Sequence, residues 1–226
     1  MSGTVRLDLH VHSAHSPDSR LRLPEIANQL PYVGLKGFAL TDHNSVEGHR
    51  RLPELRSNFP GLLVLPGIEV STREGHLLAY GISEAPPPHP SLAETLDWVH
   101  ARGGLAVLAH PFRWAHGAGR ARAEGEAVDG LEIRNGHNSN IQNFRAEVVA
   151  ARRHLLATGG SDVHELGDLG RAYTEFPAEV ASTEDLLNAL RHHRVEPGGN
   201  GLRWNARVRL GFLTGARLLA RGFRPI

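Results

Sequence analysis

The chain of 226 residues contains no cysteine, and this absence excludes several kinds of chemistry at once. Disulfide bonds, thiolate nucleophiles and cysteine-ligated zinc or iron–sulfur sites are all removed, so any metal ion must be held by histidine, aspartate or glutamate. No run of about 18 apolar residues occurs, and the sequence therefore predicts no membrane span. The N-terminus also lacks the charged and then apolar pattern of a secretion signal, so we expect a cytoplasmic protein.

An excess of charge is also lacking, since the formal net charge is +1. A nearly neutral chain argues against wrapping of nucleic acid by bulk electrostatics. The C-terminus is different, because no acidic residue follows Glu196. We expect a main domain over residues 1–196 and a basic extension over residues 197–226, in which a flexible glycine-rich stretch precedes an amphipathic segment over Val208–Phe223 that packs on the domain. The alternative is that this extension binds anionic partners.

Short β-like apolar runs alternate with helix-like stretches along most of the chain. The expected strands are Val5–Leu9, Gly37–Leu40, Leu62–Val64 with Ile68–Val70, His76–Gly81, Leu105–Ala109, Gly130–Arg134, Leu155–Ala157 and Arg171–Phe176. The expected helices are Leu23–Gln29, Val46–Ser57, Ser91–Arg102, Asn140–Arg153 and Thr183–His192. Trp114–Gly125 is expected to be a loop or a poorly ordered lid. The alternation predicts a mostly parallel sheet with helices outside it.

Histidine is abundant, with 15 copies, and several of them fall where expected strands end. The polar residues at these ends, in chain order, are His10, His12, Thr41, Asp42, His43, Glu69, His110, Glu132, Arg134, Asn135, Asp162 and His164. His76 is the exception, because it begins its strand. In parallel α/β folds the active site lies at the carboxyl ends of the strands, so we expect these side chains to meet.

The residue types in this pattern suit a site with more than one metal ion. In His10-X-His12 both rings point to one face, because side chains alternate along an extended strand, and Asp162-X-His164 repeats the spacing. A carboxylate such as Glu69 can bridge two ions about 3.5–4 Å apart. Imidazole and carboxylate ligands without thiolate favour Zn, Mn or Fe. Each element alone is weak evidence, but together and in order they predict a multinuclear metal centre.

The order of these elements resembles that of the polymerase and histidinol phosphatase (PHP) family of metal-dependent phosphoesterases. The motifs that carry the resemblance are His10-X-His12 with Asp18, Thr41-Asp42-His43, Gly67-Ile68-Glu69, His76, His110-Pro111 and Asp162-X-His164. The resemblance covers roughly residues 5–195. It implies an α/β fold, a distorted (β/α)7 barrel, with two or three divalent ions at the carboxyl ends of its strands.

The resemblance also implies a set of metal ligands. Three positions are expected: His10, His12, Glu69 and Asp162 for the first ion, Glu69 as a bridge with His76 and His110 for the second, and Asp18, His43 and His164 for the third. Asp42 is expected to orient a ligand. His15 and Glu132 are left outside the ligand set.

Such a centre is expected to hydrolyse a phosphate ester. Divalent ions lower the pKa of a shared water and generate hydroxide, which attacks phosphorus in line while the ions offset the charge of the transition state. Glu69 and Asp162 would position this nucleophile through the ions. His164, or an ion, would assist the leaving alkoxide.

An anionic substrate also needs cationic partners in the protein. Arg113 follows the His-Pro motif and Arg134 ends an expected strand, so both are expected at the mouth of the barrel. The planar guanidinium group suits phosphate, which makes these two arginines candidates for substrate binding. Asn135 and His137 are further candidates for the same role.

The leading hypothesis is a hydrolase of phosphate monoesters that acts on a small molecule or a nucleotide. A phosphodiesterase or exonuclease acting on short nucleic acid is the second, and only the basic C-terminus supports it. A third is a non-catalytic, metal-stabilised module that serves a partner, against which the intact ligand set argues. The sequence does not define an oligomeric state.

Overall fold

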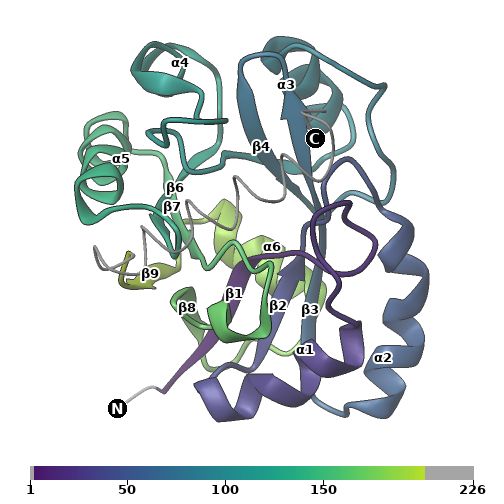
Figure 1. The fold of residues 1–226 in the computed structure, drawn as a ribbon. Helices are drawn as coiled ribbons and strands as arrows, with labels where there is room; N and C mark the ends of the chain where they lie inside the picture. Colours follow the sequence, from purple (N-terminus) through teal and green to yellow (C-terminus); the bar gives the residue numbers. More distant parts are fainter. Residues whose placement is uncertain (1–2, 202–226) are drawn as a thin grey trace.

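The computed structural model describes residues 3–201 and shows an α/β protein built on one sheet (Figure 1). The strands are β1 Thr4–Val11, β2 Gly37–Leu40, β3 Leu63–Thr72, β4 Gly75–Tyr80, β5 Leu105–Leu108, β6 Gly130–Asn135, β7 Leu156–Gly160, β8 Ala172–Pro177 and β9 Glu196–Gly199. The α-helices are α1 Leu23–Gln29, α2 Leu52–Asn58, α3 Leu92–His100, α4 Gly119–Gly125, α5 Asn140–Arg153 and α6 Thr183–Arg191. Short 3-10 segments are η1 Leu30–Val33, η2 Glu47–Arg51 and η3 Leu166–Asp168.

The strands follow the order β7-β6-β5-β4-β3-β2-β1-β8-β9 across the sheet. β1, β2 and β3 are parallel to one another, as are β5, β6 and β7. β4 runs antiparallel to both of its neighbours, β3 and β5. β8 and β9 extend the sheet beyond β1 as antiparallel strands. The alternation of strands and helices therefore produced the mostly parallel sheet that was expected.

The sheet curls until β7 returns to the side of β1. The backbone N–H of His12 donates to the carbonyl of Val163, and the N–H of Val163 donates to the carbonyl of His10, both at 3.1 Å. Gly160 makes the close approach possible, since a Cβ there would lie 2.4 Å from the Cβ of His10. The sheet is therefore nearly closed, and the expected distorted (β/α)7 barrel is confirmed.

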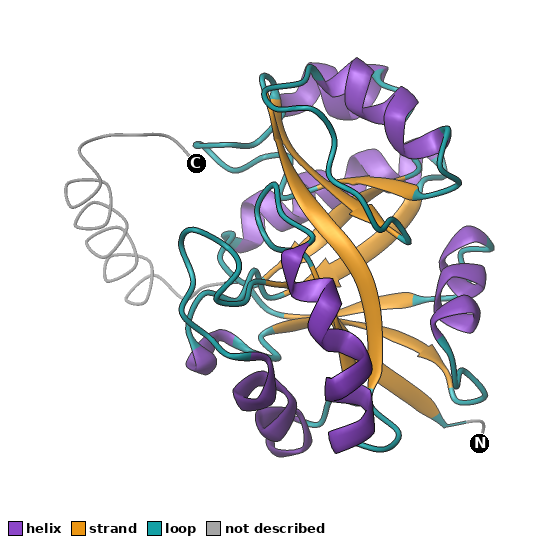
Figure 2. Ribbon diagram, turned by 90° about the vertical axis from the view of Figure 1, so that its right-hand side faces the viewer, coloured by secondary structure: helices purple, strands orange, loops and turns teal. Residues whose placement is uncertain are grey.

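The core has three parts, which the helices complete (Figure 2). Inside the barrel, inward side chains such as Leu7 and Tyr80 pack with Leu186 of α6. Outside it, α1 and α2 cover β1–β3, and α3, α4 and α5 cover the surface of β3–β7. Ser91 and Ser139 cap α3 and α5, since each side chain accepts a hydrogen bond from a backbone N–H of the first turn.

Two segments differ from expectation. Trp114–Gly125 is not wholly a loop, because it contains α4, where the Arg-Ala alternation outweighs the glycines and Ala123 is buried. The glycine-rich stretch after Glu196 is not a flexible link, because it forms β9 against β8. A Cβ at Gly198 would lie 2.5 Å from the ring of Tyr173, so glycine serves close packing here.

The expected boundary between residues 196 and 197 consequently falls inside β9. The amphipathic segment expected over Val208–Phe223 lies outside the described residues. Over residues 3–201, no helix has the length and apolar character needed to cross a membrane.

Candidate metal centre

Glu69, near the end of β3, lies at the centre of a group of buried histidines. The histidine nitrogens nearest to its carboxylate are His10 Nε2 at 2.9 Å, His12 Nε2 at 3.1 Å, His43 Nε2 at 3.4 Å, His76 Nδ1 at 2.8 Å and His110 Nε2 at 3.1 Å. These histidines belong to four separate segments of the chain. A single carboxylate that touches all of them has the position expected of a bridge between ions.

His10 and His12 both face Glu69, as their spacing predicted. Leu9 also faces inward and packs in the barrel core, which a strictly alternating strand would not allow together with His10. The register of β1 against β2 shifts between Asp8 and Val11, and a bulge of this kind changes which residues face inward. The bulge therefore separates the packing part of β1 from its polar end.

His76 joins the group although it begins its strand. β4 is antiparallel to β3, and His76 pairs in register with Ser71, two residues beyond Glu69. The start of β4 therefore lies at the same edge as the carboxyl ends of the parallel strands. The exception in the sequence pattern has a topological cause.

Three groups of side chains have ligand atoms close enough to share an ion, all within 4.8 Å of one another in each group. They are His10, His12, Glu69 and Asp162; His12, Asp18, His43 and His164; and His43, Glu69 and His76. The first matches the expected set, and the second contains the expected third set together with His12. The last differs, because it holds His43 in the place expected for His110. His110 nevertheless contacts the same Glu69 oxygen as His76.

The nitrogen atoms of His12 test whether these residues fit a cation. Its Nε2 lies 3.1 Å from Glu69 and 3.4 Å from Asp162, yet it makes a well-formed hydrogen bond to neither, nor to any other group in residues 3–201. A buried ring nitrogen without a hydrogen bond is costly unless something else occupies it. A cation between imidazole and carboxylate groups meets this need, so the donor set fits a metal ion.

The surrounding charges keep the carboxylates ionised, which is the form that binds metal. Burial alone would raise the pKa of Glu69, but the imidazole groups around it, His43 and His10 foremost, hold it well below its usual range. Burial acts likewise on Asp162, and Arg113 with His10 holds its pKa well below its usual range. Burial lowers the pKa of His43 to about 3, which keeps this ring neutral.

Glu132 of β6 supports the cluster, a role that the sequence left undecided. Its Oε1 is 2.9 Å from His10 Nδ1, so it fixes the ring whose other nitrogen faces Glu69. Its Oε2 accepts hydrogen bonds from the backbone N–H of His110 at 2.8 Å and from Asn135 Nδ2 at 2.9 Å. The available signal was a lone acidic residue inside an apolar strand.

Asp8 was missed by sequence reasoning, although it carries the same signal as Glu132. It is fully buried and accepts hydrogen bonds from the backbone N–H groups of His10, Ser161 and Gly170. Burial raises the pKa of Asp8 to about 6, although these hydrogen bonds lower it. Asp8 therefore ties β1 to the segment that carries Asp162.

Asp42 lies where an orienting residue was expected, but it holds a loop and not a ring. Its Oδ2 accepts a hydrogen bond from Ser13 Oγ at 2.8 Å, and its Oδ1 accepts one from the backbone N–H of Ser13. Ser13 directly follows His12. His15 lies outside all three groups of possible metal ligands.

Arg113 reaches the cluster from the loop after β5. Its Nη2 donates to Asp162 Oδ2 at 2.6 Å and to Asn135 Oδ1 at 2.7 Å. Its Nε donates to Asn138 Oδ1 at 3.2 Å. Two amides and a carboxylate therefore hold this guanidinium group beside Asp162, and its side chain stays 24% exposed.

Arg134 is where the structure corrects the prediction. Its guanidinium group makes two hydrogen bonds to Glu147 of α5, at 3.0 and 3.1 Å, and none to the cluster. The register of β6 against β7 shifts between Glu132 and Arg134, so Asn135 takes the inward position instead. His137 lies near the mouth, with Nε2 3.3 Å from Asp168 and its ring stacked on that of His164.

Comparison with known families separates the chain into two matched regions. The PHP domain model matches residues 8–111, and the PHP-associated model matches residues 140–195. The first match contains β1 to β5 with the histidines around Glu69, and the second contains Asp162 and His164.

Several relatives share part of the sequence. An uncharacterised protein of Methanocaldococcus jannaschii is 30% identical over 150 residues, which are 62% of this chain and 87% of that protein. A 3',5'-nucleoside bisphosphate phosphatase of Chromobacterium violaceum is 34% identical over 103 residues, 42% of this chain and 33% of that protein. A 5'-3' exoribonuclease of Escherichia coli is 30% identical over 134 residues, 54% of this chain and 45% of that protein.

A solved structure shares the fold. It is a two-domain protein of Bacteroides vulgatus, described as containing a predicted PHP-like metal-dependent phosphoesterase. The TM-score is 0.73 at 20% identity, over 88% of this chain and 66% of that one. Together with the barrel and the buried histidine and carboxylate cluster, these matches show that the chain belongs to the polymerase and histidinol phosphatase (PHP) family of metal-dependent phosphoesterases.

Proposed function

We propose that this phosphoesterase hydrolyses phosphate monoesters of a small molecule or a nucleotide, with two or three Mn, Zn or Fe ions as cofactors. The observation that carries the proposal is the contact of one buried carboxylate, Glu69, with histidines from four segments, beside Asp162 and the guanidinium group of Arg113. This arrangement combines a multinuclear ligand set with a cationic group at one edge. Both are needed to bind and hydrolyse a dianionic phosphate.

The ligand assignment follows the geometry of the three groups. His10, His12, Glu69 and Asp162 would hold one ion, Glu69 with His76 and His110 or His43 a second, and Asp18, His43 and His164 a third. When bound, divalent ions supply positive charge to phosphoryl oxygens and lower the pKa of water. Glu69 and Asp162 are the carboxylates that would hold these ions in place for the reaction.

Arg113 is proposed to bind the phosphoryl oxygens. Asn135 and Asn138 fix its orientation before substrate arrives, and its exposed fraction leaves donor groups free. A guanidinium group held in this way loses little conformational freedom on binding. Asn135 therefore acts on substrate through Arg113, and His137 remains a candidate for contact with the rest of the substrate.

His164 is proposed as a ligand and not as a proton donor to the leaving group. Its Nδ1–H donates to the carbonyl of Asp162 at 2.9 Å, and its Nε2 lies 2.6 Å from Asp18. Both ring nitrogens are therefore engaged. A general acid needs an N–H that faces the departing oxygen.

Hydrolysis of phosphodiester bonds in short nucleic acid is the second candidate function. The relative that is named as an exoribonuclease supports it, as does the basic sequence after Glu196. A non-catalytic role has less support, because every residue of the expected ligand set is present.

A panel of substrates separates these functions. Phosphate release would be measured from p-nitrophenyl phosphate, histidinol phosphate, nucleoside mono- and bisphosphates and 5'-labelled oligonucleotides, with metal content determined on the same protein. Turnover of monoesters is expected. Cleavage of oligonucleotides with inert monoesters would favour the second function instead, and a protein that binds no metal would contradict both.

The role of Arg113 is tested by a matched pair of arginine variants. Arg113→Ala should lower kcat/KM by roughly 10- to 100-fold, because a hydrogen bond to a charged group contributes about 1.5–3 kcal/mol. Arg134→Ala should leave kcat/KM within about twofold, because its partner is Glu147. Equal losses in the two variants would return Arg134 to the site.

A further inference from the structure

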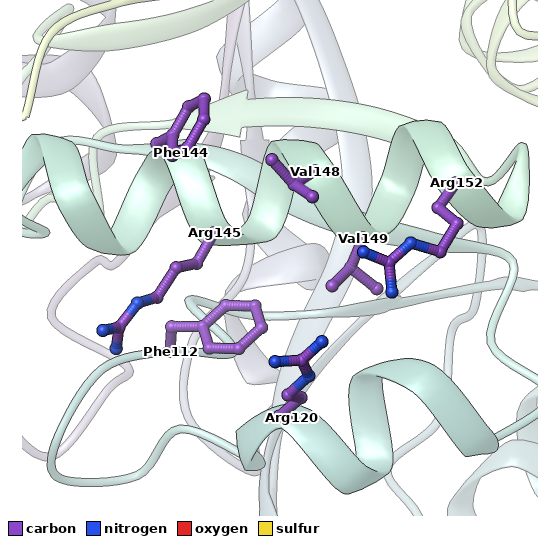
Figure 3. A pocket seen from close by; sticks show the side chains of 7 residues that line it. All are labelled: Phe112, Arg120, Phe144, Arg145, Val148, Val149 and Arg152. Carbon is purple, nitrogen blue, oxygen red and sulfur yellow. The ribbon is translucent and has the colours of Figure 1, made fainter.

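A groove of about 550 Å³ lies between α4 and α5, outside the metal centre (Figure 3). Its lining residues are Phe112, Arg120, Phe144, Arg145, Val148, Val149 and Arg152. Figure 3 shows the ring of Phe112 beneath α5, with the guanidinium groups of Arg120, Arg145 and Arg152 around it. The groove therefore combines an apolar, aromatic floor with a cationic rim.

The positive charge of this rim is only partly neutralised. Arg120 and Arg152 share a single carboxylate, that of Glu124, at 2.9 and 3.3 Å. Arg145 is exposed and has no ion pair or hydrogen bond through its guanidinium group with any residue of the described chain. Phe144 on the same helix is 62% exposed. A ligand of this groove should carry negative charge next to an apolar ring.

Both walls of the groove begin at the metal centre. Phe112 precedes Arg113, which donates to Asp162. Asn138, which accepts a hydrogen bond from Arg113, lies one residue before the Ser139 cap of α5. Since α5 starts at the carboxyl end of β6 and runs away from it, Arg145 and Arg152 lie progressively farther along the groove.

We propose that this groove binds single-stranded nucleic acid whose terminal phosphate lies at the metal centre. This inference deepens the proposed function and rests on it for the position of the reacting end. Every base offers a flat face to an aromatic side chain, and arginine can both stack on bases and pair with phosphate. Arg145 and Arg152 are two helical turns apart, about 10.5 Å, which corresponds to roughly two or three phosphate spacings along a stacked strand.

Charge argues against two other occupants of the groove. The basic sequence after Glu196 contains six arginines and no acidic residue, so the arginines of the groove would repel it. A purely acidic peptide would satisfy the rim, but it would leave the aromatic floor without a partner. A nucleotide chain satisfies both at once.

The test measures binding directly, so that it does not depend on turnover. Fluorescence anisotropy of a labelled oligothymidylate of about 12 nucleotides would be followed with the full-length protein and with two charge reversals. Arg145→Glu is expected to weaken binding by at least about tenfold and to reduce the salt dependence of the affinity. Arg194→Glu, an exposed arginine outside the groove, is the matched control and should change the affinity by less than about twofold.

The remaining arms separate the alternatives. Arg145→Gln, which removes the charge without reversing it, should weaken binding less than Arg145→Glu, and thermal unfolding by circular dichroism checks that each variant is folded. Equal weakening by Arg145→Glu and Arg194→Glu, displacement by polyglutamate as effective as by unlabelled oligonucleotide, or no binding by the unmodified protein would each overturn the proposal. Hydrolysis of p-nitrophenyl phosphate, measured on the same preparation, reports on the proposed function separately.

Discussion

Glu132 shows how one buried side chain organises a site whose members are far apart in sequence. One oxygen holds the ring of His10, and the other holds the backbone of His110 and the amide of Asn135. Asn135 in turn orients Arg113. The carboxylate therefore connects the ligands of the centre to the group proposed to bind phosphate.

Removing the charge of Glu132 should weaken the centre without removing a ligand. Glu132→Gln leaves the size of the side chain nearly unchanged but loses the charged partner of His10 Nδ1. Because groups that orient metal ligands typically contribute 10- to 100-fold, we expect metal affinity or kcat to fall by that factor, roughly. Metal titration by calorimetry, together with kcat and KM on a monoester, measures both effects.

Glu147→Gln is the matched control for Glu132→Gln. Glu147 pairs with Arg134 on the surface of α5 and touches none of the possible ligands. This variant should keep metal affinity and kcat within about twofold, since an exposed ion pair contributes little. A similar loss in both glutamine variants would show that the effect of Glu132 is not specific to His10.

At the scale of elements, the direction and closure of strands decide which side chains meet. The antiparallel direction of β4 delivers His76 from the start of its strand. The bulges in β1 and β6 turn His10 and Asn135 inward where strict alternation would not. The return of β7 to β1 brings Asp162 to within 3.5 Å of His10.

The contact between Gly160 and His10 is the tightest point of this closure. A Cβ added by Gly160→Ala would lie 2.4 Å from His10 Cβ and 2.6 Å from its backbone nitrogen, so β1 and β7 would have to separate. Overpacking of this kind costs roughly 1–3 kcal/mol. Urea unfolding should show that loss, and activity should fall with it because His10 and Asp162 move apart.

Gly125→Ala is the control for a glycine without neighbours. No atom lies within 4 Å of a Cβ added there, at the end of α4. Its free energy of unfolding should stay the same or rise by less than about 1 kcal/mol, because alanine favours helix. A large loss in this variant would mean that sensitivity to alanine is not confined to the β1–β7 contact.

At the scale of the whole molecule, bound ions would join segments from both halves of the barrel. The ligand groups draw on β1, on the loops after β1, β2 and β7, and on β3 and β4. Ions that bind only the folded protein stabilise it in proportion to ln(1 + [L]/Kd), which is about 2.7 kcal/mol at 100 times Kd. The metal centre is thus expected to add to the stability of the barrel as well as to catalysis.

Removal of metal should therefore lower the melting temperature. For a chain of this size, about 2.7 kcal/mol corresponds to a decrease of roughly 5–10 °C after treatment with a chelator, reversed by adding Mn or Zn. His12→Asn should lose most of this response. His100→Asn, which alters a surface histidine paired with Asp129, should retain it, and a chelator effect of equal size in both variants would contradict the ligand assignment.

The sequence by itself determined most of the elements and most of the candidate ligands. Hydrophobic periodicity located the strands and several helices, since one face of each must be buried wherever it lies. His10-X-His12 and Asp162-X-His164 were visible because spacing along an extended strand is a local property. Helix α4 and strand β9 were not visible, because glycine there serves packing that involves distant residues such as Tyr173.

Only the tertiary structure decided which partners these residues have. The sequence treated Arg113 and Arg134 alike, and a bulge sent one to Asp162 and the other to Glu147. Glu132 and Asp8 gained their roles from hydrogen bonds to residues up to 153 positions away. Such contacts depend on strand register, strand direction and barrel closure, and these follow from packing of the whole chain and not from any local pattern.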